Sequence, residues 1–127
     1  MGSSIMIVDD DPLMHALYKN HLERAGYSLL SARDGAEALG LAIKERPSLI
    51  FMDIMMPEMD GIAALRQLKA SEEAREIPVV VITANVAAHE AARQEALMAG
   101  AVGFLSKPFS PNQLLDQVRK ILQPPAR

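Results

Sequence analysis

The chain has 127 residues, of which 50% are hydrophobic and 23% charged, a composition that fits one globular domain with its own core. It contains no cysteine, which excludes disulfides, thiolate metal sites and cysteine nucleophiles. A net charge of −3 and 4% aromatic residues argue against nucleic-acid partners. No apolar stretch approaches the length of a membrane span and no signal peptide is recognisable, so we expect a cytoplasmic protein without a membrane partner.

Short apolar runs alternate with segments of helical spacing along the chain. Residues 5–8 form the first apolar run, which is typical of a buried strand in a parallel sheet. Asp11 and Pro12 then mark a helix start, because a carboxylate accepts free backbone N–H groups and proline suits the first helical position. Gly26 is placed to end this helix. Its buried stripe is expected to consist of Leu13, Ala16, Leu17, Leu22 and Ala25.

The second and third units repeat this order. A strand is expected over residues 27–32, after which Asp34 and Glu37 resemble a capping box that opens a helix. Residues 49–52 form the third apolar run, which ends at Asp53. The helix of the third unit is expected to carry Ile62, Leu65 and Leu68.

Two further units complete the chain. Residues 79–82 are the strongest strand candidate and end at Thr83. An alanine-rich helix is expected over residues 86–99, followed by a strand over residues 102–105. The last helix begins after Ser110, which is placed as its N-terminal cap.

Five strand–helix units with short connections predict an α/β fold, in which a five-stranded parallel sheet is covered by helices on both faces. We expect a doubly wound, three-layer sandwich that forms a single domain over residues 1–127. Its core is expected over about residues 5–122, with residues 123–127 as a tail or the start of a linker. In such sheets ligands bind beyond the carboxyl ends of the strands.

Polar side chains follow four of the five strands. Each has an ordinary explanation alone; Asp11 suits a helix cap, for example, and Asp53 a turn. Together they direct carboxylates, a hydroxyl and an ammonium group toward one edge of the sheet. Separate ordinary roles do not account for this shared location, so we expect a functional site there. The residues concerned are Asp9, Asp10 and Asp11 after the first strand, Asp53 after the third, Thr83 after the fourth and Lys107 after the fifth.

These groups suit phosphoryl transfer to a carboxylate. Several carboxylates in one cleft repel each other unless a cation neutralises them, and an all-oxygen ligand set favours Mg²⁺. A carboxylate beside the metal can attack phosphorus and form an acyl phosphate. Lysine and threonine side chains then stabilise the charge on the transferring oxygens.

With these residues in view, the chain resembles the receiver domain of bacterial response regulators. The resemblance runs from about Ile5 to Leu122 and implies a flavodoxin-like (βα)5 fold with strand order 2-1-3-4-5. Four segments in the same order and at the same spacing carry it, namely residues 8–12, 51–57, 81–84 and 104–109.

The resemblance implies a phosphoacceptor role for Asp53 and a metal site. Asp9, Asp10 and Asp53 would supply the carboxylates, and the backbone carbonyl of Met55 a further ligand. The expected ion is Mg²⁺, with Mn²⁺ as a substitute.

The resemblance also implies a switch. Thr83 and Lys107 would contact the phosphoryl oxygens, with a cis bond between Lys107 and Pro108. Phe104, where relatives often carry tyrosine, would turn inward when Thr83 moves, and so change the face of the fourth helix, fifth strand and fifth helix. Met55 and Asn85 hold positions that tune the lifetime of the phosphoryl group, and an apolar Met55 implies slow to moderate self-hydrolysis.

The implied function is a signalling module that accepts a phosphoryl group from a sensor histidine kinase or a histidine phosphotransfer protein. It is not expected to be an enzyme beyond catalysing its own phosphorylation and slow dephosphorylation, and it is expected to be a monomer or weak dimer.

Two alternatives are a metal-dependent phosphatase with Asp53 as nucleophile, disfavoured by Met55 where an acid is needed, and a receiver that binds partners without phosphorylation. We expect exposed helix positions for His15, His21 and His89.

Overall fold

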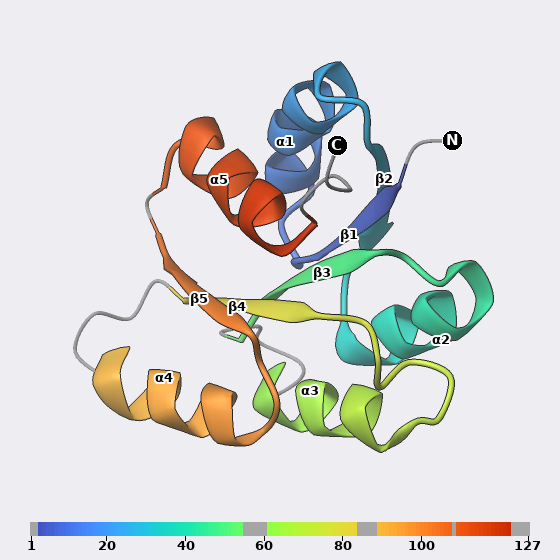
Figure 1. Ribbon diagram of the computed structural model, residues 1–127, viewed down its shortest axis with the longest axis vertical. Coiled ribbons are helices and arrows are strands. Elements are labelled where there is room, and N and C mark those ends of the chain that lie inside the picture. The colour runs from blue at the N-terminus through green and yellow to red at the C-terminus, as the bar shows by residue number, and fades with distance from the viewer. Residues whose placement is uncertain (1–2, 55–60, 84–88, 108, 123–127) are drawn as a thin grey trace, which may run out of the picture.

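Five parallel strands lie in the order β2-β1-β3-β4-β5 in the computed structural model (Figure 1). The structure describes residues 3–54, 61–83, 89–107 and 109–122. This order confirms the predicted sheet, in which β1 and β3 are adjacent interior strands. The strands are β1 (Ser4–Val8), β2 (Ser28–Ala32), β3 (Leu49–Asp53), β4 (Val79–Thr83) and β5 (Gly103–Ser106).

Helices cover both faces of the sheet and form a three-layer sandwich, as predicted. Helices α1 (Pro12–Arg24) and α5 (Pro111–Ile121) lie side by side on one face. Helices α2 (Gly35–Glu45), α3 (Gly61–Ala70) and α4 (His89–Met98) cover the other face (Figure 1).

The central strands are buried on both faces, which explains their continuous apolar sequence. In β3, Ile50 and Met52 belong to the core beneath α2, α3 and α4, whereas Leu49 and Phe51 belong to the core beneath α1 and α5. All four side chains are fully buried. Because side chains alternate between the faces of a strand, each apolar run supplies both cores.

The helix starts follow the predicted caps, with one difference in detail. The Asp11 carboxylate accepts a hydrogen bond from the Leu13 N–H at 3.0 Å, and Ser110 forms a full capping box at the start of α5. Asp34 accepts from the Glu37 N–H at 2.8 Å. The Glu37 carboxylate, however, accepts from the N–H of Arg33, one residue before the cap, at 2.8 Å.

The predicted stripe of α1 is wrong at every position except Leu22. Leu13 and Leu17 are 75% and 52% exposed, and the residues that α1 buries are Tyr18 and Leu22. Tyr18 stacks on Phe109, with ring centroids 5.4 Å apart. A stacked aromatic pair removes more apolar surface from water than the two leucines would, so the helix turns its Tyr18 side to the core. Ala16 and Ala25 are also exposed.

Two other observations bear on the sequence predictions. Helix α4 is described from His89, and the first residues of the predicted helix, 86–88, lie outside the described residues. No helix in the described part of the chain is both long and apolar enough to cross a membrane.

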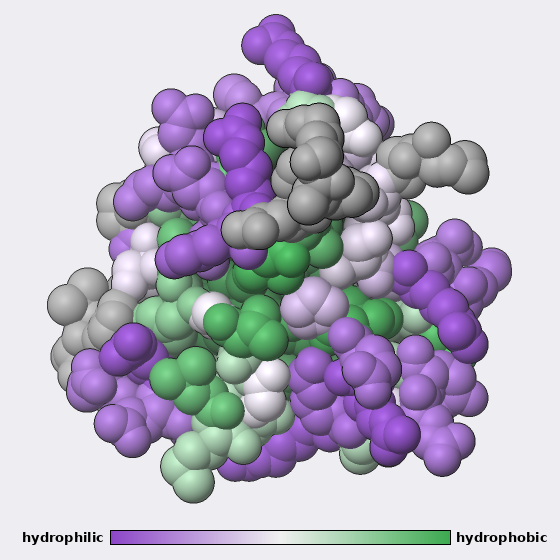
Figure 2. Space-filling view, in the orientation of Figure 1, coloured by the Kyte–Doolittle hydropathy of each residue, from purple (hydrophilic) through white to green (hydrophobic). Residues whose placement is uncertain are grey.

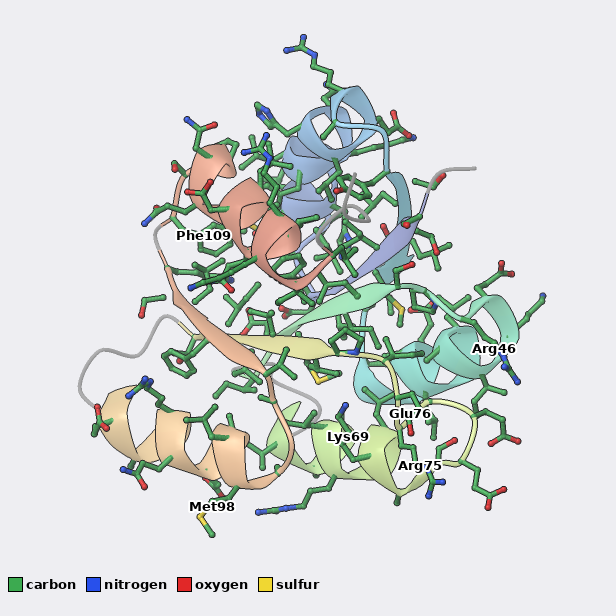
Figure 3. The ribbon with its side chains drawn as sticks, viewed as in Figure 1. Arg46, Lys69, Arg75, Glu76, Met98 and Phe109 are labelled. Carbon is green, nitrogen blue, oxygen red and sulfur yellow. The ribbon has the colours of Figure 1, made fainter. Side chains whose placement is uncertain are left out.

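Arg46 provides a test of local backbone strain. It caps the end of α2 in the left-handed conformation, with φ 50° and ψ 63°, and its side chain is exposed (Figure 3). A side chain with a Cβ is disfavoured there, so Arg46→Gly should raise the free energy of unfolding by about 0.5–1 kcal/mol. Urea denaturation measures the change. The control is Lys44→Gly inside the same helix, which should lower stability by about 1 kcal/mol; equal losses in both variants would contradict the assignment.

Candidate functional site

The carboxyl ends of β1 and β3 bring three aspartates together. Val8 lies opposite Met52 in the parallel register, so the residues that follow them, Asp9 and Asp53, meet at the same edge of the sheet. Carboxylate oxygens of Asp9, Asp10 and Asp53 lie within 4.8 Å of one another. Asp9 and Asp53 are buried, whereas Asp10 is exposed, so the cluster has one side open to solvent.

Lys107 reaches this cluster from the end of β5. Its ammonium Nζ donates to Asp53 Oδ2 at 2.8 Å and lies 3.3 Å from Asp9 Oδ2. Its backbone N–H donates to the carbonyl of Thr83 at 2.8 Å, which ties the lysine to the end of β4. The side chain therefore extends from the end of β5 to the ends of β3 and β1, where it contacts two carboxylates at once.

The charges in the cluster are not balanced. Burial raises the pKa of Asp9, and the nearby Asp53 raises it further, against the lowering effects of the Asp11 N–H and of Lys107. Burial alone would lower the pKa of Lys107, but this pKa is raised because the hydrogen bonds and charges of Asp53 and Asp9 together outweigh burial. One ammonium thus faces three carboxylates, and the surplus negative charge favours a further cation.

The donor set fits Mg²⁺. The three side chains offer only carboxylate oxygens, the hard ligands that this ion takes, and the exposed Asp10 leaves room for the waters that it keeps. Lys107 already acts as a cation on two of the three carboxylates, which indicates a site shaped for positive charge.

The other predicted residues surround this cluster in part. Thr83 ends β4 with 1% of its surface exposed and lies opposite Ser106 in the register of β5. Phe104 lies in β5 and packs against the core beneath α3 and α4. The structure therefore places Thr83 on a strand adjacent to Asp53, with Phe104 on the next strand. The predicted roles of Met55, Asn85 and Pro108 fall outside the described residues.

Gly61 supports the site in a way that the sequence did not reveal. A Cβ on this residue would lie 2.4 Å from the Cα of Ile54 and 2.8 Å from the carbonyl oxygen of Asp53. The start of α3 therefore packs directly on the backbone that carries Asp53, and only glycine allows this approach.

His15 also supports the site, from a position on α1 that differs from the predicted one. His15 and His21 were both expected to be exposed, but both are half-buried, and the side chain of His89 lies outside the described residues. Nε2 of His15 lies 2.8 Å from the carbonyl oxygen of Asp9. The signal that could have located it is its spacing, because His15, Tyr18 and Leu22 recur at intervals that share one helix face. On the same face, burial raises the pKa of Tyr18, while the charge of Lys107 lowers it.

The raised pKa of Asp9 predicts a stability change. A carboxyl whose pKa is higher in the folded state stabilises the fold only while it is protonated, and that contribution is lost as pH rises through the folded pKa. Asp9→Asn should therefore raise the free energy of unfolding at pH 7 without divalent metal, and the gain should shrink as pH falls toward 4. Urea denaturation across this range measures it. The exposed Asp10→Asn control should change stability by less than about 0.5 kcal/mol at pH 7; a loss of stability in Asp9→Asn at pH 7 would refute the argument.

Comparisons with known proteins agree with this geometry. Residues 5–119 match the family model of the response regulator receiver domain. The polar-differentiation response regulator DivK of Brucella anthropi is 36% identical over 122 residues, covering 96% of this chain and 98% of the relative.

Two solved structures are similar in fold and sequence. The chemotaxis response regulator CheY4 of Vibrio cholerae superposes with a TM-score of 0.86 at 30% identity, covering 95% of this chain and 99% of its own. The receiver domain of the sensor histidine kinase PA1611 of Pseudomonas aeruginosa, solved with a magnesium ion in its active-site cleft, has a TM-score of 0.85 at 31% identity. That alignment covers 98% of this chain and all of the other. The chain belongs to the response regulator receiver domains of two-component signalling.

Proposed function

We propose that the chain accepts a phosphoryl group on Asp53 from a phosphohistidine, carried by a sensor histidine kinase or a histidine phosphotransfer protein. The observation that carries this proposal is the buried Asp53 carboxylate, held 2.8 Å from the Lys107 ammonium within a cluster of three aspartates. Family membership and the magnesium ion of the PA1611 receiver domain support it.

The transfer needs no general base, because the attacking group is a carboxylate and carries no proton that must be removed. A carboxylate oxygen of Asp53 attacks the phosphorus and forms an O–P bond. The P–N bond to the donor imidazole breaks, and its electron pair returns to the ring nitrogen. The product on this chain is an acyl phosphate.

Other residues stabilise the charge on the transferring oxygens. The Lys107 ammonium is placed for this role by its contact with Asp53 Oδ2, and the Thr83 hydroxyl is proposed to donate a hydrogen bond to a phosphoryl oxygen. Asp9, Asp10 and Asp53, with the Met55 carbonyl, would hold Mg²⁺ or Mn²⁺. The ion supplies further positive charge at the phosphoryl oxygens when it is bound.

Receiver domains are signalling modules rather than enzymes that turn over separate substrates. We propose that this one catalyses only its own phosphorylation and a slow dephosphorylation, with Met55 and Asn85 tuning the lifetime. We further propose that it acts in the cytoplasm as a monomer or weak dimer, with protein partners and neither nucleic acid nor membrane.

A surface cavity supports the proposed output face. The cavity, about 590 Å³ in volume, lies between α4, β5 and α5. Its apolar lining includes Phe104, Leu97 and Val102, and Arg93 and Lys120 contribute positive charge. Figure 2 shows apolar side chains gathered over α4 and β5 at the lower left of the view. Because Phe104 lines this cavity, a change in its rotamer would alter the surface that a downstream protein meets.

Phosphorylation of Asp53 is tested by intact mass. Incubation with acetyl phosphate and Mg²⁺ should add one phosphoryl group to the wild-type chain and none to Asp53→Asn, because the asparagine amide is not a nucleophile for this step. Omission of Mg²⁺ should abolish the addition. Absence of both an adduct and released phosphate, in a folded protein that binds Mg²⁺, would instead indicate a receiver that binds partners without phosphorylation.

The switch is tested at Thr83. Thr83→Ala should still accept the phosphoryl group on Asp53, but the amide chemical-shift changes that phosphorylation causes in α4, β5 and α5 should fall to a small fraction of the wild-type values. The reason is the loss of the hydroxyl that links the phosphoryl group to Phe104. Two-dimensional NMR of the phosphorylated proteins measures this. Thr83→Ser keeps the hydroxyl and should keep the shifts; full shifts in Thr83→Ala would remove Thr83 from the switch.

A further inference from the structure

His15 is bonded to the backbone of the acidic cluster rather than to a side chain. Its Nε2 lies 2.8 Å from the carbonyl oxygen of Asp9. A carbonyl oxygen only accepts hydrogen bonds, so Nε2 carries the proton and donates it. The ring therefore has a defined tautomer and orientation, set by this one bond.

The bonded carbonyl belongs to the peptide unit that joins Asp9 to Asp10. The other groups of Asp9 have different partners: its N–H donates to the carbonyl of Ala32 at 3.0 Å, and Oδ1 accepts from the N–H of Asp11 at 3.0 Å. In the described part of the chain, the hydrogen bond from His15 is thus the side-chain contact that orients the peptide between Asp9 and Asp10. That plane determines the direction in which the chain continues to Asp10.

The unused nitrogen of the ring strengthens this argument. Nδ1 of His15 is buried and finds no hydrogen-bond partner in the described part of the chain. Burying an unpaired polar atom costs free energy, and an apolar side chain of similar size would fill the space without that cost. Packing alone therefore does not explain an imidazole at this position, whereas the Nε2 bond to Asp9 does.

We propose that His15 is a positioning residue for divalent metal binding. By holding the peptide between Asp9 and Asp10, it keeps the two carboxylates in the relative orientation that a shared cation requires. The inference rests on the proposed function, because it assumes that these carboxylates bind Mg²⁺. It adds a residue from α1 whose role is exerted through the backbone, as the outer partners of metal ligands commonly act.

The test uses two amides that differ in reach. In His15→Gln the amide nitrogen of the new side chain falls near the place of Nε2, whereas in His15→Asn the shorter side chain brings its amide only to the place of Nδ1. Calorimetric titration with Mg²⁺ should give a dissociation constant about tenfold higher for His15→Asn and His15→Leu than for the wild type. His15→Gln should stay within about threefold of the wild type, because the donor is restored. His21→Leu, further along the same helix, is the matched control and should leave affinity unchanged.

Two further readouts separate positioning from general destabilisation. In the metal-free protein, the amide resonance of Asp10 should shift in His15→Asn and His15→Leu and return toward the wild-type position in His15→Gln. At saturating Mg²⁺, the rate of phosphorylation by acetyl phosphate should recover in all three variants, since the deficit lies in metal affinity. Thermal unfolding confirms that each variant is folded, and if His15→Leu does not fold, the comparison of His15→Gln with His15→Asn decides.

The outcomes distinguish the two proposals. If the wild type binds Mg²⁺ and all His15 variants bind it equally well, the positioning role is overturned and the proposed function stands. If His15→Gln is as weak as His15→Asn, the Nε2 bond is not the cause and the role is likewise overturned. If the wild type itself binds no Mg²⁺ at millimolar concentration, the metal-dependent function fails, and the inference fails with it.

Discussion

The contact of the Lys107 ammonium with Asp53 and Asp9 is the interaction on which the site depends. Two buried carboxylates at the ends of adjacent strands repel each other, and each would be costly to bury without a cation. Lys107 supplies that cation from β5, two strands away from β3 in the sheet. The strand order found, with β4 between β3 and β5, therefore places Lys107 where it compensates both carboxylates. The charge balance of the site thus depends on the strand order of the sheet.

The elements around the cluster fix it through the backbone more than through side chains. Gly61 lets α3 approach the carbonyl of Asp53, the N–H of Lys107 bonds the end of β4, and His15 holds the carbonyl of Asp9. Helix α1 also reaches the segment after Lys107 through the stack of Tyr18 on Phe109, which lies beside α5 (Figure 3). Groups fixed in this way lose little entropy when a ligand arrives, which suits a site that binds small, highly charged groups.

Much of the fold follows from local patterns, and the exceptions have identifiable causes. The five strand segments, the caps at Asp11 and Ser110, and the polar strand ends follow from local patterns, and the structure confirms them. The strand order came from the family resemblance, because each local pattern is compatible with several orders. The buried face of α1 was mispredicted because the helix carries two apolar stripes, and the choice depends on Phe109, far along the chain. His15 was missed because its partner is a backbone carbonyl, which no side-chain pattern displays.

The surplus of acid suggests why metal and phosphoryl group would act together in the proposed function. An acyl phosphate on Asp53 replaces one carboxylate charge by a phosphate that carries roughly two. Lys107, now shared between Asp53 and Asp9, would be drawn toward the larger charge, and Asp9 would lose part of its compensation. In the proposed function, a divalent cation on Asp9 and Asp10 would restore that balance, so the phosphorylated state would depend on the metal more than the free state does. In the proposed switch, Thr83 on the adjacent strand β4 would then respond to a site whose charge has changed.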